Sequence, residues 1–319
     1  CVLPLSIACN VGPQFATVHK IMRKTPGRWR FAFFDREPPA LFGEDVKTRN
    51  AIILWSKSLS QTNAEIATGP LLRWHGDSRA MMFRNLRFTP IDTDIDDGIP
   101  KIEGHHQAAA LAALRVRSNR LEQAVQKIRR QSLTTSFGAD DKTVFVGPTA
   151  YNFLNVFLAP PRSLVQRRYV LSDHPLHSIA CASREDALAI FAILSSHLAY
   201  WWWHANGDGF HVSTSFISEI PFGADALTGP KREILSHYGS DLWSKINLHP
   251  IISLNRGKSS LAFSPNGHDR LRRQIDTKLA KLARLDAMLV DELQQFTAHV
   301  VAAKPRSAAF TDISDKERV

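Results

Sequence analysis

An ordered series of apolar segments at the start of the chain constrains its fold more than any other feature. Residues 2–8 form a near-continuous apolar run, as in a parallel strand that is buried on both faces. A helical pattern follows over residues 14–23, and residues 28–34 and 50–55 supply two runs rich in aromatic and β-branched residues. The order strand, helix, strand, strand predicts the closing half of an α/β sheet, in a chain that begins partway through its own fold.

The composition indicates a globular chain with ordinary cores, because 44% of the residues are hydrophobic and 9% are aromatic. No window approaches the roughly 18 consecutive apolar residues of a membrane span, and no basic segment precedes the first apolar run. We therefore expect a cytoplasmic protein without membrane association. Cys1, Cys9 and Cys181 are too few and too scattered for a disulfide framework or a zinc site, so we expect reduced core cysteines.

The charge balance favours a polyanionic partner. The formal net charge is +10, and a basic protein gains affinity for nucleic acid by releasing counterions from phosphates. Residues 107–130 predict a helix with one basic face, which either is solvated or contacts phosphate. Its basic residues are Arg115, Arg117, Arg120, Lys127, Arg129 and Arg130. Arg162, Arg167 and Arg168 stand just before a further predicted strand at residues 169–172.

The segment 199–222, with the sequence AYWWWHANGDGFHVSTSFISEIPF, is the most distinctive part of the chain. A helix over residues 186–200, with Ser183 as its N-cap, leads directly into Trp201–Trp203, of which we expect at least one in the core. Residues 206–209 must then turn. Hydroxyl side chains follow at positions 213–215.

Another candidate for ligand contact is Phe42, in the segment FFDREPPALFGEDVKTRNAIILW at residues 33–55. An aromatic side chain in a loop at the edge of an α/β sheet can stack on a planar ligand, such as a base that has left its duplex. The alternative is that Phe42 only closes the local core.

The C-terminal part predicts helices over residues 268–285 and 288–301, and the tail after Lys304 is expected to be disordered. The first of these helices has a basic outer face, which we interpret as solvated rather than functional. The residues of this face are Arg270, Arg272, Arg273, Lys278, Lys281 and Arg284. The acidic turn at residues 92–98 leaves no apolar face to bury and predicts a domain boundary.

Other chemistries find little support in the sequence. The histidines His105, His106, His174 and His177 lack the carboxylate or cysteine cluster of a metal site, and the acidic turn lacks the spacing of a calcium loop. No GxSxG elbow is present for a serine nucleophile. Residues 140–142 and 44–47 each combine acids with a lysine, as nuclease sites do, but such short patterns are common.

The order of seven motifs resembles the C-terminal half of class I S-adenosylmethionine-dependent N6-adenine DNA methyltransferases of restriction-modification systems. The motifs are VLPLS, FDREPPALF, VKTRNAIIL, GPLLRW, RAMMFRNL, WWWHANGDGFHV and IPF. The resemblance implies a remnant of a Rossmann-like catalytic sheet over residues 1–97 and an α+β DNA target-recognition domain over 98–228. A helical segment over 229–303 and a tail over 304–319 would follow.

The resemblance also implies roles for individual residues. Val2–Ser6 would be the strand after the catalytic loop, and Phe42 would stack on the adenine flipped out of double-stranded DNA. The other implied DNA contacts are Arg167, Arg168, Trp203, Gly207, Gly209, His211, Ser213 and Thr214. The glycines would permit close approach of the backbone, and the hydroxyl and imidazole groups would donate to phosphates.

The chain departs from the family at two motifs. The Asn/Asp-Pro-Pro-Tyr tetrapeptide, which holds the adenine amine, is absent, since Pro38-Pro39 and Pro160-Pro161 follow Glu37 and Ala159. A glycine loop for S-adenosylmethionine is absent as well, so an upstream portion or a separate catalytic subunit would bind most of the cofactor. We therefore expect these residues to be inactive alone. The alternatives are a non-catalytic DNA-binding specificity subunit and a basic α/β protein with a coincidental resemblance.

Overall fold

The computed structural model contains two compact units. The first unit comprises Cys1–Val116, Trp201–Phe210 and the described part of Gln295–Arg306, and the second comprises Arg117–Tyr200 and His211–Gln294. The domain limits predicted at residues 97 and 228 stay predictions. The structure describes residues 1–36, 41–42, 48–57, 62–73, 79–84, 86–92, 98–132, 141–159, 162–165, 168–171, 175–255 and 258–301.

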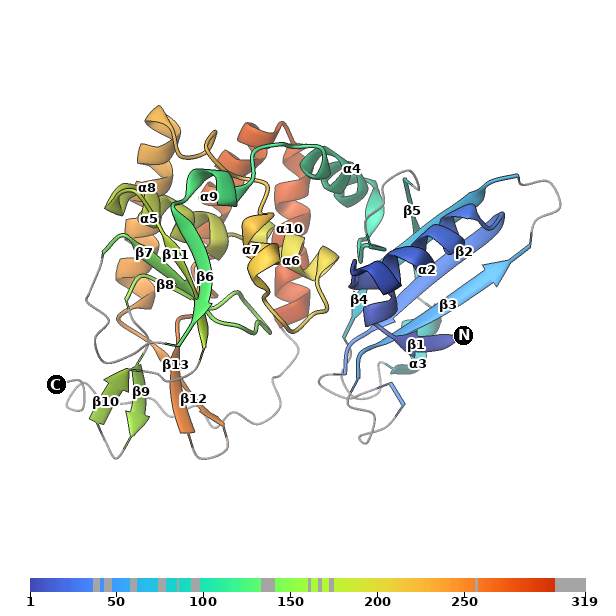
Figure 1. The fold of residues 1–319 in the computed structure, drawn as a ribbon, viewed down its shortest axis with the longest axis horizontal. Coiled ribbons are helices and arrows are strands. Elements are labelled where there is room, and N and C mark those ends of the chain that lie inside the picture. The colour runs from blue at the N-terminus through green and yellow to red at the C-terminus, as the bar shows by residue number, and fades with distance from the viewer. Residues whose placement is uncertain are drawn as a thin grey trace. The chain divides into compact units, whose positions relative to one another are not determined.

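The first unit is built on a five-stranded sheet with the order β1-β3-β2-β4-β5 (Figure 1). β2 and β4 run parallel, whereas the other neighbouring pairs are antiparallel. This mixed sheet with helices confirms the α/β class expected from the sequence. The strands are β1 (Val2–Pro4), β2 (Gly27–Phe34), β3 (Asn50–Ser56), β4 (Ala64–Leu72) and β5 (Thr89–Ile91), and the helices are α1 (Ser6–Cys9), α2 (Pro13–Lys24), α3 (Arg79–Arg84) and α4 (Gly104–Arg115).

Successive residues in the second half of β2 enter two different cores, which explains why Phe31–Phe34 is an apolar run rather than an alternation. Phe31 and Phe33 belong to a core that also contains Met22 of α2. Phe34 belongs to another core, together with Met82 of α3. Both faces of β2 are therefore buried over Phe31–Phe34, whereas Arg28 and Arg30 in its first half are exposed.

The opening run of the chain differs from the predicted parallel strand. β1 pairs antiparallel with β3, and α1 already begins at Ser6. Val2 is 49% exposed, whereas Leu5 and Ala8, three positions apart, are buried. That spacing belongs to a helix, and a short apolar run cannot by itself distinguish a buried strand from a buried helix.

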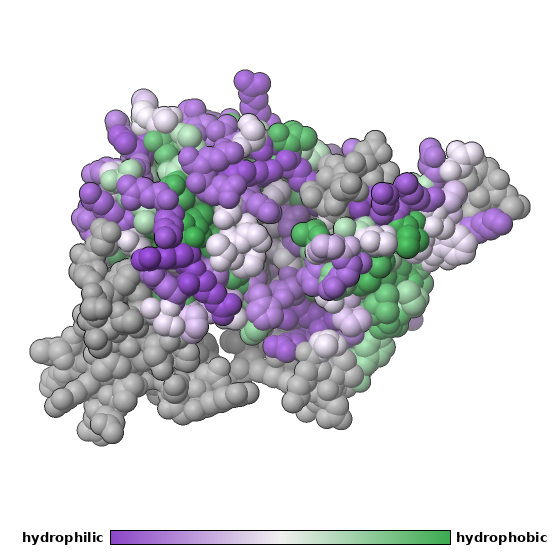
Figure 2. Space-filling view, viewed as in Figure 1, coloured by the Kyte–Doolittle hydropathy of each residue, from purple (hydrophilic) through white to green (hydrophobic). Residues whose placement is uncertain are grey.

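Large hydrophobic side chains are exposed on the first unit around β1. They are Val2 on β1 and Leu54 and Trp55 on β3. Figure 2 shows hydrophobic surface in this part of the unit. The pairing between β1 and β3 covers only Asn50–Ile52 of β3, so Leu54 and Trp55 lie beyond the end of the paired segment.

The second unit contains a four-stranded antiparallel sheet with the order β6-β11-β7-β8. Its strands are β6 (Lys127–Gln131), β7 (Thr143–Val146), β8 (Val156–Phe157) and β11 (Leu176–Ala180); two hairpins are β9 (Arg162–Val165) with β10 (Arg168–Leu171), and β12 (Ile251–Asn255) with β13 (Lys258–Ala262). Its helical segments are η2 (Leu121–Ala124), α5 (Arg184–Ser195), α7 (Thr214–Ser218), α8 (Gly229–Ile246) and α9 (Asp269–Ala283). Along the chain, α6 (His197–Asn206) and α10 (Ala287–Val301) start in the second unit and end in the first. Among the described helices, none combines the length and the apolar character that crossing a bilayer requires.

The predicted basic helix over residues 107–130 is wrong in its second half. α4 ends at Arg115, and β6 pairs with β11 along its whole length from Lys127 to Gln131. Whether a short segment forms a strand depends on such tertiary pairing, which the helical periodicity of apolar residues does not reveal. The basic residues beyond Val116 are therefore divided between a loop and a strand.

The predicted helix over residues 186–200 is interrupted. Ser183 is its N-cap, as expected, because the hydroxyl accepts a hydrogen bond from the Asp186 N–H. Ser196 is extended, with ψ 159°, and its hydroxyl accepts from the Ala199 N–H at 2.9 Å. This serine therefore ends α5 and caps α6, which turns one predicted helix into two.

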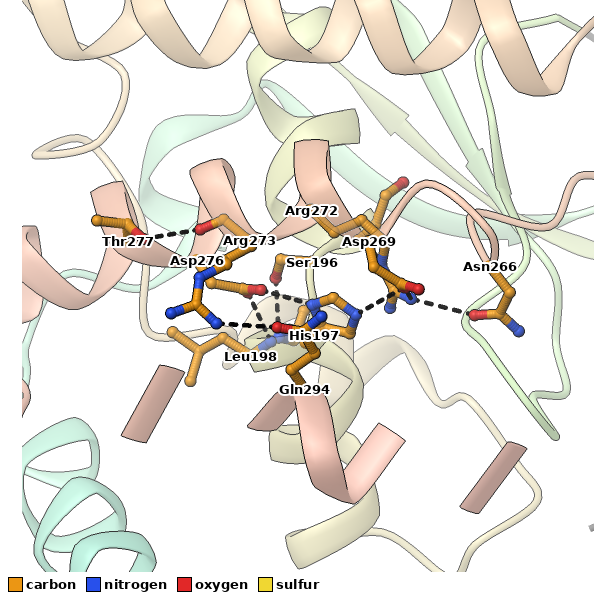
Figure 3. A network of polar contacts seen from close by, with 12 residues as sticks. Ser196, His197, Leu198, Asn266, Asp269, Arg272, Arg273, Asp276, Thr277 and Gln294 are labelled. Carbon is orange, nitrogen blue, oxygen red and sulfur yellow. Dashed lines mark hydrogen bonds and ion pairs between the residues drawn. The ribbon is translucent and has the colours of Figure 1, made fainter. Parts of the chain in front are cut away.

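A buried carboxylate of α9 fixes the start of α6 (Figure 3). Asp276 Oδ2 lies 2.7 Å from His197 Nδ1, and Asp276 Oδ1 accepts from the Leu198 N–H at 3.0 Å. His197 Nε2 lies 3.4 Å from Asp269 Oδ1. Asp276 thus joins two helices that are far apart in sequence and compensates the first turn of α6, where free N–H groups favour negative charge.

Arg272 is a core residue rather than part of a solvated face, which corrects the sequence prediction. It is 1% exposed, and its Nε donates to the Ser195 carbonyl at 2.9 Å. Burial lowers the pKa of this guanidinium to about 10. Arg272 precedes Ile275 and Leu279 by three and seven positions, so the helical repeat places it on the buried face of α9.

Replacing Asp276 by Ala should lower the free energy of unfolding of the second unit by about 3–5 kcal/mol, because His197 and the first turn of α6 lose their buried partner. Asp276→Asn, which keeps an acceptor at this position, should cost less. Urea denaturation followed by circular dichroism measures both changes. Asp241→Ala, on the exposed surface of α8, is the control and should stay within about 0.5 kcal/mol of wild type; an equal effect of the Asp276 and Asp241 variants would contradict this role.

Candidate functional site

The ends of three strands meet at one edge of the sheet in the first unit. β2 and β4 run parallel and end at this edge, and β3 starts there because it is antiparallel to β2. Charged residues stand directly at these ends: Asp35 after β2, Arg49 before β3 and Arg73 after β4. In open α/β sheets, ligands bind at the carboxyl edge of the parallel strands. We call this edge, with Asp35, Arg49 and Arg73, the carboxyl edge.

Asp35 is the buried centre of the carboxyl edge. Its Oδ1 lies 2.8 Å from Arg49 Nε, and its Oδ2 accepts from Arg73 Nε at 2.7 Å. The Arg36 N–H also donates to Oδ1, at 2.7 Å. A carboxylate that is 0% exposed is tolerable only when charged donors compensate it, and two guanidiniums leave the cluster net positive.

The Gly207–Phe210 segment packs on the carboxyl edge. The Phe210 ring centre lies 5.2 Å from the Arg36 guanidinium carbon and 5.6 Å from that of Arg49, distances typical of cation–π contacts. The Phe210 N–H donates to Asp208 Oδ1 at 2.8 Å, which stabilises the turn. Residues from strand ends and from the end of α6 are thereby brought together.

Close packing explains why position 209 is a glycine. Gly209 has φ +77°, and an added Cβ would lie 2.9 Å from Leu71 Cδ2 and 3.0 Å from Arg49 Nε. The first distance is shorter than real Cβ contacts, and the conformation is one that other residues rarely adopt. This glycine therefore permits close approach to β4 and Arg49, within the protein itself.

Lys101 holds the end of α6 from inside the first unit. Its Nζ donates to the carbonyl oxygens of Ala205 at 3.0 Å and Gly207 at 2.6 Å, and its backbone N–H also donates to Ala205. Burial lowers the pKa of Lys101 to about 8. The ammonium group is therefore held where the last carbonyls of a helix concentrate partial negative charge.

The aromatic residues of α6 belong to the core. Trp201, Trp202 and Trp203 are 1%, 7% and 0% exposed, and Trp201 Nε1 donates to Gln107 Oε1 at 3.0 Å. Burial, followed by the positive charges of Arg73, Lys101 and Arg49, lowers the pKa of His204 well below its usual value. Trp203 thus contributes packing, and nothing in its placement supports a direct contact with DNA.

Phe42 has the exposure that a stacking side chain needs. Its side chain is 48% exposed, whereas its neighbour Leu41 is 2% exposed and packs with Phe34 and Met82. Leu41 therefore closes the local core, and the alternative role considered for Phe42 is not needed. Residues 37–40 and 43–47 lie outside the described part of the chain.

The remaining predicted DNA contacts belong to the second unit. His211 and Ser213 are exposed, and Thr214 is half-buried. Ser213 Oγ caps α7 by accepting from the Phe216 N–H at 3.0 Å, and Thr214 Oγ1 lies 3.2 Å from His177 Nδ1. Arg167 lies outside the described residues, and Arg168 lies in β10, with its side chain outside the described part.

The alternative chemistries gain nothing from the structure. Within the described ranges, no group of three or more His, Cys, Asp or Glu residues is arranged to hold a metal ion. His177 is a core residue, 2% exposed, whose Nε2 lies 2.7 Å from the Val212 carbonyl oxygen. Asp141 pairs with Arg184 at 3.2 Å, while Asp140, Glu44, Asp45 and Lys47 lie outside the described residues.

Sequence reasoning did not identify the charged members of the carboxyl edge. Asp35, Arg36, Arg49 and Arg73 lie within the FDREPPALF, VKTRNAIIL and GPLLRW motifs or next to them. A usable signal was available for Asp35 and Arg49, because each stands directly at the end of a predicted apolar strand, whereas no strand was predicted before Arg73. A buried charge at such a position indicates a partner from another strand.

Replacing Gly209 by Ala should destabilise the first unit more than replacing Gly104 by Ala. Both glycines have φ +77°, but an added Cβ meets nothing within 4 Å at Gly104. Gly104→Ala should cost about 1–2 kcal/mol for the backbone strain alone. Gly209→Ala should cost about 1–3 kcal/mol more, from overlap with Leu71 and Arg49. Equal losses in urea denaturation would show that close packing does not determine position 209.

The stability of the first unit should depend on pH through Lys101. Its pKa is about 8 in the folded protein against a usual 10.5, so the unfolded chain binds more protons between these values. Stability should therefore rise with pH across this window, by at most ~3 kcal/mol. The test compares wild type with Lys101→Met by urea denaturation at about pH 7 and pH 10. The stability difference should grow in favour of wild type, whereas a control comparison with Lys20→Met, exposed on α2, should stay constant.

No model of a known protein family matches this chain, and no curated protein matches it. The assignment of a function consequently depends on the residues and on the geometry described above.

Proposed function

We propose that this chain is the DNA-binding and target-recognition portion of a site-specific N6-adenine DNA methyltransferase of a restriction-modification system. The observation that carries the proposal is the exposed Phe42, which follows β2 along the chain and whose neighbour Leu41 packs in one core with Phe34 at the end of that strand. Ligands of α/β sheets bind at the carboxyl ends of parallel strands, and an aromatic ring that is 48% exposed offers a stacking surface for an extrahelical base.

Electrostatics support a nucleic acid as the partner. The chain carries a net charge of +10, and at the carboxyl edge Arg36 is half-buried, next to Arg49 and Arg73, which are buried against Asp35. Positive charge beside a stacking aromatic is the combination by which proteins hold unpaired nucleotides. The order β1, α2, β2, β3 supports an origin in the closing part of an α/β sheet.

The chain does not itself supply a site for S-adenosylmethionine. It lacks the glycine loop for the cofactor and the Asn/Asp-Pro-Pro-Tyr tetrapeptide for the adenine amine. Another portion or subunit would hold the cofactor, which donates the methyl group. We accordingly assign no step of methyl transfer to these residues, and their proposed work is to grip DNA and to position the flipped base.

A non-catalytic specificity subunit is the second candidate, and the same missing motifs favour it. The two candidates differ in what they need for activity, because a specificity subunit works beside a separate catalytic chain. Pull-down of a protein containing the tetrapeptide by the tagged chain would support the subunit. Methylation by a single polypeptide that includes these residues would support the first candidate.

Phe42→Ala should weaken base positioning. Loss of a stacking platform costs about 1–3 kcal/mol, which corresponds to a roughly 5- to 150-fold lower kcat/KM for methyl transfer to plasmid DNA. The assay follows incorporation of labelled methyl groups by the complete enzyme, and Phe42→Tyr should retain most of the activity.

Phe83→Ala provides a matched control, because Phe83 is also an exposed aromatic, at 46%, and lies in the same unit. Its replacement should leave the kinetics unchanged. Unchanged kinetics in Phe42→Ala would remove Phe42 from the site, and wild-type protein that fails to bind duplex DNA would refute the proposed function altogether.

A further inference from the structure

β6 is a strongly basic strand at the edge of the sheet in the second unit. It lies at the end of the order β6-β11-β7-β8, and its Lys127, Arg129 and Arg130 are all exposed. Within the described part of the chain, these side chains make no ion pair. Three cations are thus presented together on a strand of five residues.

The pairing register shows that this charge extends to both faces of the sheet edge. Arg130 is directly opposite His177 on β11, whereas Arg129 is opposite Ser178. Neighbouring residues of a strand point to opposite faces, so Lys127 and Arg129 share one face and Arg130 lies on the other. The cations of this edge strand therefore lie on both faces of the sheet rather than on one.

The fold places the predicted phosphate-binding segment 211–215 beside this strand. α7 packs against β6, and Thr214 Oγ1 lies 3.2 Å from His177 Nδ1. His177 is the cross-strand neighbour of Arg130 and also contacts the carbonyl of Val212. Two features found separately in the sequence, basic residues and exposed His and Ser side chains, are therefore adjacent.

The other arginines that the sequence grouped with β6 are used inside the protein. Arg117 contacts the Asp225 carboxylate and donates to the carbonyls of Pro221 at 2.9 Å and Leu282 at 3.4 Å. Arg120 Nη1 donates to the Glu219 carbonyl at 3.2 Å. Glu122 in η2 and Glu219 at the end of α7 are also exposed.

We propose that β6 and residues 211–215 together form the surface on which this chain holds the phosphate backbone of duplex DNA. The inference rests on the proposed function, and it specifies which surface of the chain contacts the DNA. Lys and Arg neutralise phosphates, and exposed hydroxyl, imidazole and backbone N–H groups donate to phosphate oxygens. A basic edge strand can also serve only to prevent edge-to-edge aggregation, so the experiment must separate the two roles.

The test replaces the three cations together, as Lys127→Gln, Arg129→Gln and Arg130→Gln, in the full chain. Binding of a fluorescent duplex of mixed sequence is measured by anisotropy over a series of salt concentrations. Each lost phosphate contact lowers the slope of log K against log salt by about 0.9, so the slope should fall by roughly 2–3.

The matched control carries the same change of net charge on α9, as Arg270→Gln, Lys278→Gln and Lys281→Gln. Its slope should stay within about half a unit of wild type if contact, rather than overall charge, determines binding. A third variant, Ser213→Ala with His211→Ala, should weaken binding several-fold with little change of slope, since both groups are neutral donors.

Four outcomes would overturn the inference. Equal slope changes in the β6 and α9 variants would reduce the effect to net charge. Aggregation of the β6 variant with unchanged DNA binding by its soluble fraction would leave edge protection as the role of these residues. Displacement of DNA by polyglutamate as efficient as by unlabelled duplex would indicate an acidic protein as the partner. Wild-type protein that binds no duplex would refute the proposed function as well, which distinguishes the two failures.

Discussion

The first unit depends on one buried carboxylate, that of Asp35. Isolated in a core, this charge would cost far more than a domain's net stability, so its two guanidinium partners must be in place for the unit to fold. Arg49 and Arg73 come from two other strands, and Arg49 also contacts Phe210. One electrostatic requirement therefore fixes the ends of β2, β3 and β4 and the Gly207–Phe210 segment together. The same requirement gathers two guanidinium groups around one carboxylate at this edge of the sheet.

The second unit also contains a buried carboxylate, and here it binds donors at the start of a helix. Asp276 is a buried acceptor that satisfies donors of α6, the Leu198 N–H and the His197 ring. Arg272 of the same helix satisfies a carbonyl at the end of α5. A single helix, α9, thereby compensates the end of one helix and the start of the next at the Ser196 break. Helix ends are costly to bury without partners, and this explains why two charged residues occupy the inner face of α9.

The sequence predicted those parts of the structure that depend on local patterns. The helix α2, the strands β2 and β3, and the Ser183 cap follow from periodicity and capping chemistry, and the structure confirms them. It did not predict β6 or the burial of Arg272, because cross-strand pairing and interhelical contacts determine these features. Of the candidate site, the sequence identified Phe42 but left its exposure open, because an aromatic residue at such a position can also close the local core. The partners of Asp35 could not be derived, since three strand ends must meet before the pairing exists.

Burial of α6 has a consequence for how relatives of this chain should be compared. The side chains from His197 to Ala205 are all at most 7% exposed, so each substitution there changes the packing of a core. Gly209 is fixed by the space beside Leu71 and Arg49 in the same way. Similarity between two chains in this distinctive segment would therefore report a shared fold, whatever ligand each chain binds. Differences in what two such chains bind would have to arise at exposed positions, where substitutions are tolerated.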